Sequence, residues 1–292
     1  MRSDTRRFFH AGPAKVTRDD PRYHAAVVNA STLRRAAGRA KRLWLARPPG
    51  LGQADKTRNW RRVRYAGLRR RCPVCHSRVS RYLASPKPLE RPDAVCPVCG
   101  ALEWHRFGWW YLETSHGDLL RAGAHVLHVA AEPALRPKFL AIPGLHYMAL
   151  DLDLRRATVV ADLQHLPMPD GSIDLVYCSH VLEHVHDDRA AMAELRRVIK
   201  PTGAALIQVP VSAEVTWGDP SITDPAERTR LFGLHDHVRR YGPDVVDILT
   251  EQGWRVDRIN TLDLAPADVD RLGLPHHEIA RPAFDVFWCT PQ

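Results

Sequence analysis

The sequence predicts an α/β fold, in which a doubly wound, mostly parallel sheet follows a small zinc-ribbon module and a basic N-terminal segment. Three observations support this architecture. Short apolar runs alternate with helical patterns after Gly117, two CPVC motifs lie twenty residues apart, and positive charge is concentrated before the first motif. Strands that alternate with helices indicate a parallel sheet covered on both faces. We therefore expect three parts, at residues 1–68, 69–112 and 113–292.

The apolar runs after Gly117 predict the strands of the sheet, because they have the length of buried strands and are separated by helical patterns or turn residues. The strands are expected at 125–130, 145–152, 157–163, 173–176 and 203–211. Two later runs, at 255–264 and 284–290, predict an antiparallel hairpin at the sheet edge.

Helical patterns lie between these strands and in the basic segment. Helices are expected at 31–46, 187–200 and 243–254. Asp187 and Asp188 suit the N-terminus of the second one, where carboxylates accept free backbone N–H groups. Pro201 and Gly203, in the KPTG sequence, are expected to end that helix and to turn the chain.

Charge is distributed unevenly along the chain. Residues 1–71 carry 20 Lys and Arg against 4 Asp and Glu, a net charge of +16, whereas the remainder carries −7. Such a segment can hold nucleic acid or another anionic surface by counterion release, or it can be a solvated face. No transmembrane segment is expected, since no run of eighteen apolar residues occurs. The N-terminus lacks an apolar core after its charges, which predicts a cytoplasmic protein.

Four of the six cysteines form the CPVC motifs. They are Cys72, Cys75, Cys96 and Cys99. Each CxxC turn places two thiolates on one side, and two such turns form a tetrahedral S4 site that suits Zn²⁺. A redox pair is the alternative for either motif alone. Four protein ligands leave no open position, so the predicted zinc is structural. This usage of cysteine indicates a reducing compartment rather than a disulfide framework.

One stretch resembles a known family. The sequence LPMPDGSIDLVYCSHVLEHVHDDRAAMAELRRVIKPTG, at 166–203, resembles the signature of class I S-adenosylmethionine-dependent methyltransferases of the small-molecule type. A looser resemblance extends from about residue 117 to the end, and CPVCGALEWHRFGWWYL resembles a bacterial subset with a ribbon before this domain. The resemblance implies a seven-stranded Rossmann-like sheet, S-adenosylmethionine as cofactor, and methyl transfer to oxygen or nitrogen of a small-molecule or peptide-like metabolite.

The resemblance also implies a cofactor site at the ends of the strands. Asp151 would accept hydrogen bonds from the ribose hydroxyls, with Leu152 beside it. Asp162 would accept a hydrogen bond from the adenine amino group, and Leu163 would pack near the ring. A carboxylate suits two hydroxyl donors. The alternative for both acids is ordinary capping of strand ends.

The first turn departs from the family pattern, which has an acid in the strand and then three glycines. His128 replaces the acid, and Ala130, Glu132 and Ala134 occupy the glycine positions. Glycine lets the backbone approach a ligand closely. Glu132 has two possible roles: it pairs with the ammonium group of the cofactor in place of the lost acid, or it fills the pocket and abolishes binding.

The resemblance implies further site residues after the fourth and fifth strands. Ser179 and His180 would face the methionine part of the cofactor and the reacting methyl group. His237, Arg239 and Tyr241 match a segment that lies over the substrate in related enzymes. Histidine suits proton removal near neutral pH. His237 and His180 are therefore the predicted catalytic residues, and Arg239 and Tyr241 the predicted substrate contacts.

Two other functions stay open. The basic segment and the ribbon could bind or methylate RNA. The sequence Cys178-Ser179-His180-Val181 stands where base-methylating enzymes carry Asn-Pro-Pro-Tyr, which disfavours amino-methylation of a flipped base. The altered first turn is also compatible with a catalytically inactive scaffold.

Overall fold

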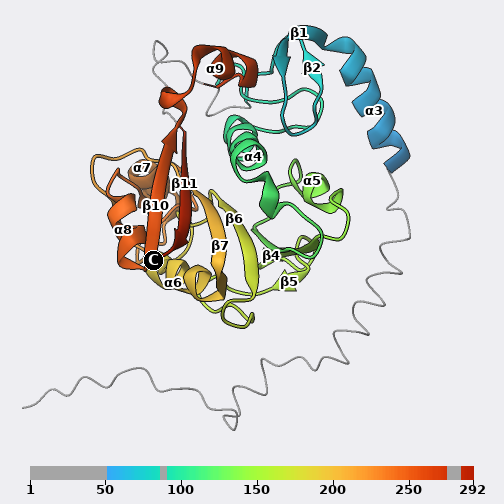
Figure 1. Ribbon diagram of the computed structural model, residues 1–292. Coiled ribbons are helices and arrows are strands. Elements are labelled where there is room, and N and C mark those ends of the chain that lie inside the picture. The colour runs from blue at the N-terminus through green and yellow to red at the C-terminus, as the bar shows by residue number, and fades with distance from the viewer. Residues whose placement is uncertain (1–50, 86–90, 275–283) are drawn as a thin grey trace, which may run out of the picture. The chain divides into compact units, whose positions relative to one another are not determined.

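A seven-stranded sheet forms the centre of the structure (Figure 1), with the strand order β10-β11-β7-β6-β3-β4-β5. The computed structural model describes residues 51–85, 91–274 and 284–292, and only the backbone of 51–57. The strands are β3 (His125–Val129), β4 (His146–Asp151), β5 (Val159–Val160), β6 (Ile173–Ser179), β7 (Ile199–Gln208), β10 (Trp254–Asn260) and β11 (Asp285–Pro291).

The sheet is mostly parallel and reverses its winding beside β3. From β3 the chain proceeds through β4 to β5 on one side, and through β6 to β7 on the other, with all these pairs parallel. β11 is antiparallel to both β7 and β10. The predicted fold class and the late antiparallel hairpin are confirmed. The reversal between β3 and β6 is where doubly wound sheets bind ligands.

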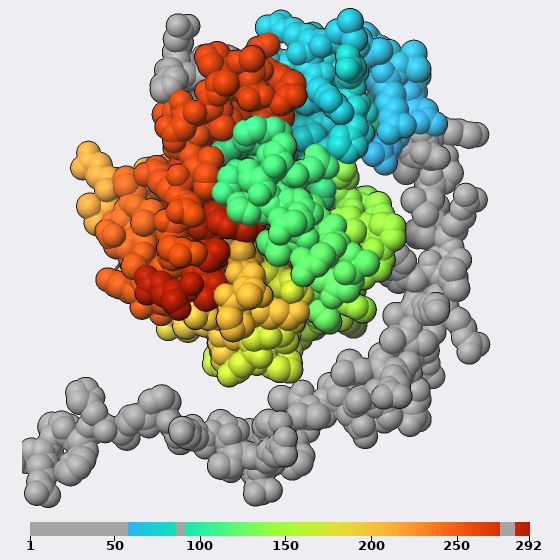
Figure 2. All heavy atoms as spheres, viewed as in Figure 1, coloured from blue at the N-terminus to red at the C-terminus, as the bar shows by residue number. Residues whose placement is uncertain are grey.

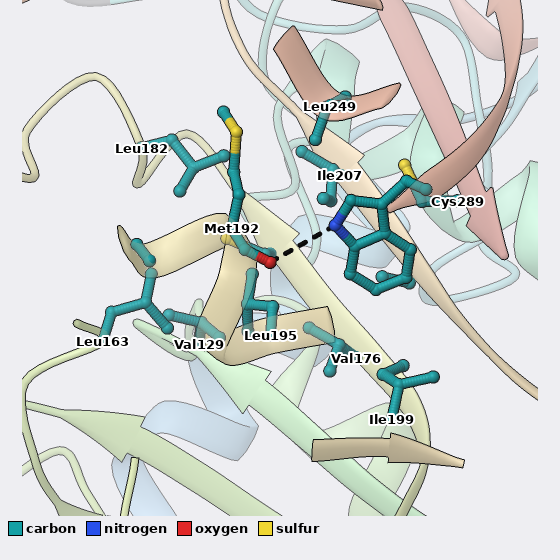
Figure 3. Close-up of a cluster of buried hydrophobic side chains, with 14 of the residues drawn as sticks. Val129, Leu163, Val176, Leu182, Met192, Leu195, Ile199, Ile207, Leu249 and Cys289 are labelled. Carbon is teal, nitrogen blue, oxygen red and sulfur yellow. Dashed lines mark hydrogen bonds between the residues drawn. The ribbon is translucent and has the colours of Figure 1, made fainter. Parts of the chain in front are cut away.

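Helices cover both faces of the sheet. Successive side chains of a strand point to opposite faces, so that they belong alternately to two hydrophobic clusters. In β6, Val176 and Cys178 belong to the cluster under α6 (Asp188–Val198) and α8 (Val245–Glu251). Figure 3 shows this cluster, where the indole N–H of Trp254 donates to the Met192 carbonyl at 3.3 Å. Leu175 and Tyr177 face the other cluster, which is covered by α4 (Glu103–Ser115), α5 (Arg136–Leu140) and α9 (Pro266–Leu272).

The second cluster continues into the cysteine module, which follows α3 (Leu51–Arg64) and contains β1 (Ala66–Arg71) and β2 (Arg78–Val79). In Figure 2 the atoms of α9, in orange, lie against this module, in cyan. The predicted boundaries after residues 68 and 112 fall inside β1 and α4. The helix predicted at 31–46 lies outside the described residues.

The predicted end of the second helix is wrong. Helix α6 ends at Val198 and β7 begins at the next residue, so that Pro201 and Gly203 lie inside a strand. The register between β6 and β7 shifts at this point, and a bulge of this kind tolerates proline and glycine. A Cβ on Gly203 would lie 2.8 Å from the Asp174 carbonyl oxygen, so glycine permits the close approach of the two strands.

Shorter elements fill the connection between β7 and α8. They are β8 (Trp217–Gly218), α7 (Pro225–Phe232) and β9 (Arg239–Arg240), and β8 pairs with β9. Two single turns of 3₁₀-helix lie at Gly117–Leu119 and Thr261–Asp263. In the parts of the chain that the structure describes, no helix is long and apolar enough to cross a membrane.

Candidate active site

A pocket of about 250 Å³ lies at the carboxyl ends of β3 and β4, beside the reversal of the sheet. Five of the residues predicted to contact a cofactor line it: Ala130, Asp151, Leu152, Asp162 and Leu163. They come from three successive segments of the sheet, and the parallel register brings their carboxyl ends together. The fold therefore gathers these residues, which are far apart in the sequence, around one cavity.

Both acids of the pocket are held by backbone N–H groups two residues further along the chain. Asp151 Oδ1 accepts from Asp153 N at 2.9 Å, and Asp162 Oδ1 accepts from Gln164 N at 2.9 Å. The hydrogen bond from Gln164 lowers the pKa of Asp162. The carboxylates are thus fixed in orientation at the rim of the cavity.

The turn after β3 keeps the bend that glycine would give, although it contains none. Ala130 has φ = 48°, in the left-handed region, and its N–H donates to the Leu150 carbonyl at 2.7 Å. A residue with a Cβ adopts this conformation at a cost of roughly 1–2 kcal/mol. The turn therefore adopts a left-handed conformation at Ala130 at the expense of local strain.

Glu132 lies in a buried polar cluster behind that turn. One of its carboxylate oxygens pairs with Nε2 of His128, and the other, Oε1, has no hydrogen-bond partner among the described residues. Burial raises the pKa of Glu132, but the bond from His128 and the nearby imidazoles outweigh it, so that the pKa is lowered. The cluster thus holds an ionised carboxylate with a free buried oxygen.

His128 is fully buried and does not line the cavity. Its Nδ1 lies 3.0 Å from the Tyr147 hydroxyl, and its Nε2 points at Glu132. The contact of His128 with the cofactor stays a prediction, and in the structure this side chain pairs with Glu132.

Helix α4 contributes two residues that the sequence analysis missed. His105 Nε2 lies 3.7 Å from Glu132 Oε1, and its Nδ1 accepts from the Leu102 N–H at 3.1 Å. Burial lowers the pKa of His105 to about 4. The Trp104 ring lies 4.6 Å from that of His180. The aromatic run EWHRFGWW could have indicated these two residues, but the sequence prediction placed this run in the ribbon and not in the site.

The predicted pair Ser179 and His180 lies at the end of β6, with the His180 ring beside that of Trp104. Ser179 is buried, and its Oγ has no hydrogen-bond partner among the described residues. His180 has φ = 53°, and its Nδ1 lies 3.2 Å from Glu183 Oε1. Its side chain is 23% exposed, so that the imidazole is oriented by a carboxylate and still open to a ligand.

His237 is 8% exposed, and its ring centroid lies 4.7 Å from that of His184. Burial lowers its pKa, which favours the neutral imidazole. His184 also lines the pocket that contains the two acids. The structure thus brings His237 to the side of the pocket formed by the turn after β6.

Arg239 and Tyr241 do not face a cavity. Both are buried, and the Arg239 guanidinium donates to the carbonyls of Leu182 and His186. The Tyr241 hydroxyl donates to Asp188 at 2.6 Å. Their contact with substrate stays a prediction, and in the structure their polar atoms attach the β9 segment to the turn after β6 and to the start of α6.

The four predicted metal ligands also meet. Cys72 Sγ lies 3.7 Å from Cys99 Sγ, and Cys75 Sγ lies 3.8 Å from Cys96 Sγ. Zn–S bonds of about 2.3 Å in a tetrahedron place sulfur atoms roughly 3.8 Å apart. All four ligand atoms lie within 4.8 Å of one another. The spacing fits a tetrahedral zinc site with no open position.

A comparison of the sequence with known protein families gives a match that agrees with the sheet topology. Residues 122–207 match the family model described as a methyltransferase domain. This segment is a class I S-adenosylmethionine-dependent methyltransferase domain. The methyltransferase domain match begins just before β3 and ends in β7, so it contains the turn at Ala130, both acids and His180.

Curated relatives match this chain over only part of their own length. A demethylmenaquinone methyltransferase of Corynebacterium glutamicum is 35% identical over 103 residues, 32% of this chain and 45% of that protein. An uncharacterized 37.1 kDa protein in transposon TN4556 of Streptomyces fradiae is 37% identical over 86 residues, 28% of this chain and 24% of that protein. The chain spans less than half the length of these curated relatives.

Solved structures resemble the chain more weakly. A putative sarcosine dimethylglycine methyltransferase from Galdieria sulphuraria has a TM-score of 0.44 at 18% identity, covering 64% of this chain and 86% of that one. The complex of the Haloferax volcanii Trm112 methyltransferase activator with a putative methyltransferase has a TM-score of 0.42 at 17% identity, covering 62% and 92%.

The methyltransferase domain match does not contain the whole site. Trp104 and His105 precede it on α4, and His237 follows it. These residues come from segments that pack on the domain from the ribbon side and from the connection before β9. Residues from both before and after the matched segment thus contribute to the site.

Proposed function

We propose that this protein transfers a methyl group from S-adenosylmethionine to oxygen or nitrogen of a small-molecule or peptide-like acceptor, and that the four cysteines hold a structural Zn²⁺. One observation carries the proposal: Asp151, Asp162 and the left-handed turn at Ala130 line a single cavity at the reversal of the sheet. That is where doubly wound sheets bind nucleotide-like ligands.

The residues of the cavity fit this cofactor. Asp151 would hold the ribose hydroxyls and Asp162 the adenine amino group. Glu132 offers a buried, ionised oxygen that accepts no hydrogen bond within the described residues and has only His105 Nε2 near it, at 3.7 Å, which suits the ammonium group of the methionine part. An unpaired buried carboxylate is costly unless a cation or donor joins it. This supports a cofactor role for Glu132 over the alternative in which it blocks the pocket.

When bound, the cofactor supplies an electrophilic methyl group on a sulfonium. The chain must then orient the acceptor and remove its proton where needed. His180 is placed for this task, because Glu183 holds its Nδ1 and thereby leaves Nε2 as the basic nitrogen. His237 is the second predicted base, and it is more deeply buried.

Calorimetry with S-adenosylhomocysteine tests the proposal. We expect wild type to bind, and Asp151→Ala and Glu132→Gln to lose at least about tenfold in affinity, since each removes a charge-assisted hydrogen bond worth about 1.5–3 kcal/mol. Glu214→Gln, at an exposed acid, is the control. Absence of binding by folded wild type, or unchanged affinity in both variants, would refute the cofactor assignment.

An anionic partner is a second candidate, favoured by the surface of α3. The side chains of Arg58, Arg61 and Arg62 are exposed, with no ion-pair partner in the described ranges, and Trp60 between them is 61% exposed. Cationic side chains with an exposed aromatic ring suit single-stranded nucleic acid. A pocket of about 590 Å³ adjoins α3 and is lined by Arg58, Arg61, His76 and Lys138.

Fluorescence anisotropy with a labelled RNA oligonucleotide tests this candidate. Affinity should fall steeply between about 50 and about 200 mM salt, and the double variant Arg61→Glu/Arg62→Glu should weaken it further, because phosphate contacts release counterions. Arg121→Glu, which changes an exposed arginine away from α3, should have little effect. Equal losses in both variants would indicate non-specific attraction.

A further inference from the structure

We propose that Glu183, His184 and His237 form a second metal site, for a divalent transition-metal ion, beside the pocket of the methyltransferase domain. Their ligand atoms all lie within 4.8 Å of one another. Glu183 and His184 come from the turn after β6, and His237 comes from the segment before β9. The site shares no residue with the four cysteines.

Glu183 provides an independent indication that a ligand belongs there. The residue is 1% exposed, and its Oε2 has no hydrogen-bond partner in the described part of the chain. The other oxygen, Oε1, is held by His180 Nδ1 at 3.2 Å. A buried ionised carboxylate with a free oxygen is costly, and a bound cation would remove that cost.

The His184 imidazole is oriented as metal ligands commonly are. His184 Nδ1 lies 3.2 Å from the Asp236 carbonyl oxygen and 3.4 Å from its carboxylate. A carbonyl only accepts, so Nδ1 carries the proton and Nε2 presents its lone pair. Such outer contacts fix the tautomer of a ligating histidine.

The ligand set indicates the class of ion. Two imidazoles with one carboxylate suit Zn²⁺, Fe²⁺, Co²⁺ or Mn²⁺ better than Mg²⁺ or Ca²⁺, which prefer oxygen ligands. Three protein ligands leave coordination positions open, in contrast to the cysteine site. His184 lines the pocket and its side chain is 35% exposed, so a ligand in the pocket can reach such a position.

The role of this ion, unlike the site itself, rests on the proposed function. An ion at these residues would attract a hydroxyl oxygen of the acceptor and lower its pKa. In this arrangement His237 is a ligand of the ion and not a base, so that His180 is the base of the site. The acceptor oxygen would pass its proton to solvent or His180 and bond to the methyl carbon, while the electron pair of the broken carbon–sulfur bond stays on sulfur. The site thus favours acceptors with a hydroxyl group able to bind a metal.

Cobalt titration of the full chain, with Zn²⁺ already bound at the cysteines, tests the site. We expect one additional Co²⁺ per chain, with d–d absorption but without a thiolate-to-cobalt charge-transfer band. Glu183→Gln and His237→Ala should each weaken binding at least about tenfold, as losses of a metal ligand do. His235→Ala changes an exposed histidine two residues away and should leave binding unchanged.

Binding that survives in both ligand variants, or no additional Co²⁺ in wild type, would overturn the metal site. If Glu183→Gln does not fold, His184→Ala, at a partly exposed side chain, replaces it and should show the same loss. Calorimetry with S-adenosylhomocysteine on the same samples separates the two proposals. Cofactor binding without cobalt refutes only the metal site, and cobalt without cofactor refutes only the methyltransferase function.

Discussion

At the scale of single residues, the proposed site has its buried carboxylate in the turn after the first strand. The family pattern places an acid in the first strand, but here that position holds His128, and the carboxylate comes from Glu132 in the following turn. His128 bonds to one oxygen of Glu132, and His105 of α4 lies 3.7 Å from the other. The charge is thus kept at the same edge of the sheet by a different set of residues.

The pH dependence of stability should report on His105. Its pKa is about 4 in the folded protein against an ordinary value of 6.5, so folding favours the neutral form. The unfolded chain therefore binds more protons between these values, and stability falls as the pH is lowered from about 6.5 to about 4. Protonation at Nδ1 would also abolish the bond from the Leu102 N–H.

Urea unfolding at a series of pH values measures this effect. The free energy of unfolding of wild type should change by up to about 1.4 kcal/mol per pH unit more than that of His105→Gln in this window. Above pH 7 the two slopes should agree. Parallel curves throughout the acid range would show that His105 keeps its ordinary pKa.

The sequence predicted the residues of the pocket but not the groups behind it. Asp151 and Asp162 could be located because each follows a recognisable apolar strand. Trp104 and His105 approach the site from α4, which precedes the sheet in the chain and reaches it only through tertiary packing. The roles of Arg239 and Tyr241 depend on which way their side chains turn, and the motif that they match does not specify this.

At the scale of elements, α4 is attached by Arg106. This side chain is fully buried and donates to the carbonyls of Ala94, Ala101 and Leu272 at 2.7 to 2.9 Å. The guanidinium also lies 3.9 Å from the Tyr82 ring centroid. Bonds from one cation thus join the cysteine module, α4 and the end of α9.

Arg106→Met should therefore destabilise the fold strongly. The change leaves several buried carbonyl oxygens without a donor, and loss of such a network costs about 3–5 kcal/mol. Arg121→Met, at an exposed arginine near the start of the sheet, should change stability by less than about 0.5 kcal/mol. The free energy of unfolding in urea distinguishes the two, and similar values for both variants would contradict the assignment.

Element boundaries followed from sequence where apolar runs were continuous, as in β3, β4 and β11. The predicted boundaries were wrong where tertiary contacts determine the end of an element. Pro201 and Gly203 normally end a helix, but β7 had already begun at Ile199, and the shifted register of β6 accommodates them. The short α7 lies in a polar stretch without a strong pattern, and the sequence analysis assigned no helix there.

At the scale of the whole molecule, the cysteine module and one face of the sheet share a hydrophobic cluster. Val74 and Val98 of the module belong to the same cluster as Phe107 of α4 and Tyr177 of β6. We therefore expect a metal that orders the CPVC turns also to support α4, which packs in the same cluster. The module acts on the site through packing, since its cysteines lie apart from the two acids.

Removal of the metal should weaken cofactor binding as well as stability. Stripping Zn²⁺ with a chelator should lower the melting temperature by on the order of 10 °C, because structural zinc contributes directly to folding. Affinity for S-adenosylhomocysteine should fall in parallel, and added Zn²⁺ should restore both. Cys75→Ser serves as the control, since it should begin in the weakened state and no longer respond to the chelator. Full affinity in the stripped wild type would show that α4 stands without the module.

The shared cluster also limits how such a protein can change by recombination. A crossover between the cysteine module and the sheet would separate Arg106 from the carbonyls that it satisfies, and would pair α4 with a foreign surface. A descendant that lost the cysteines would at the same time need other side chains to pack over β3 and β6. The two parts are therefore expected to be inherited together, and exchange of segments between homologues should be tolerated only upstream of α3.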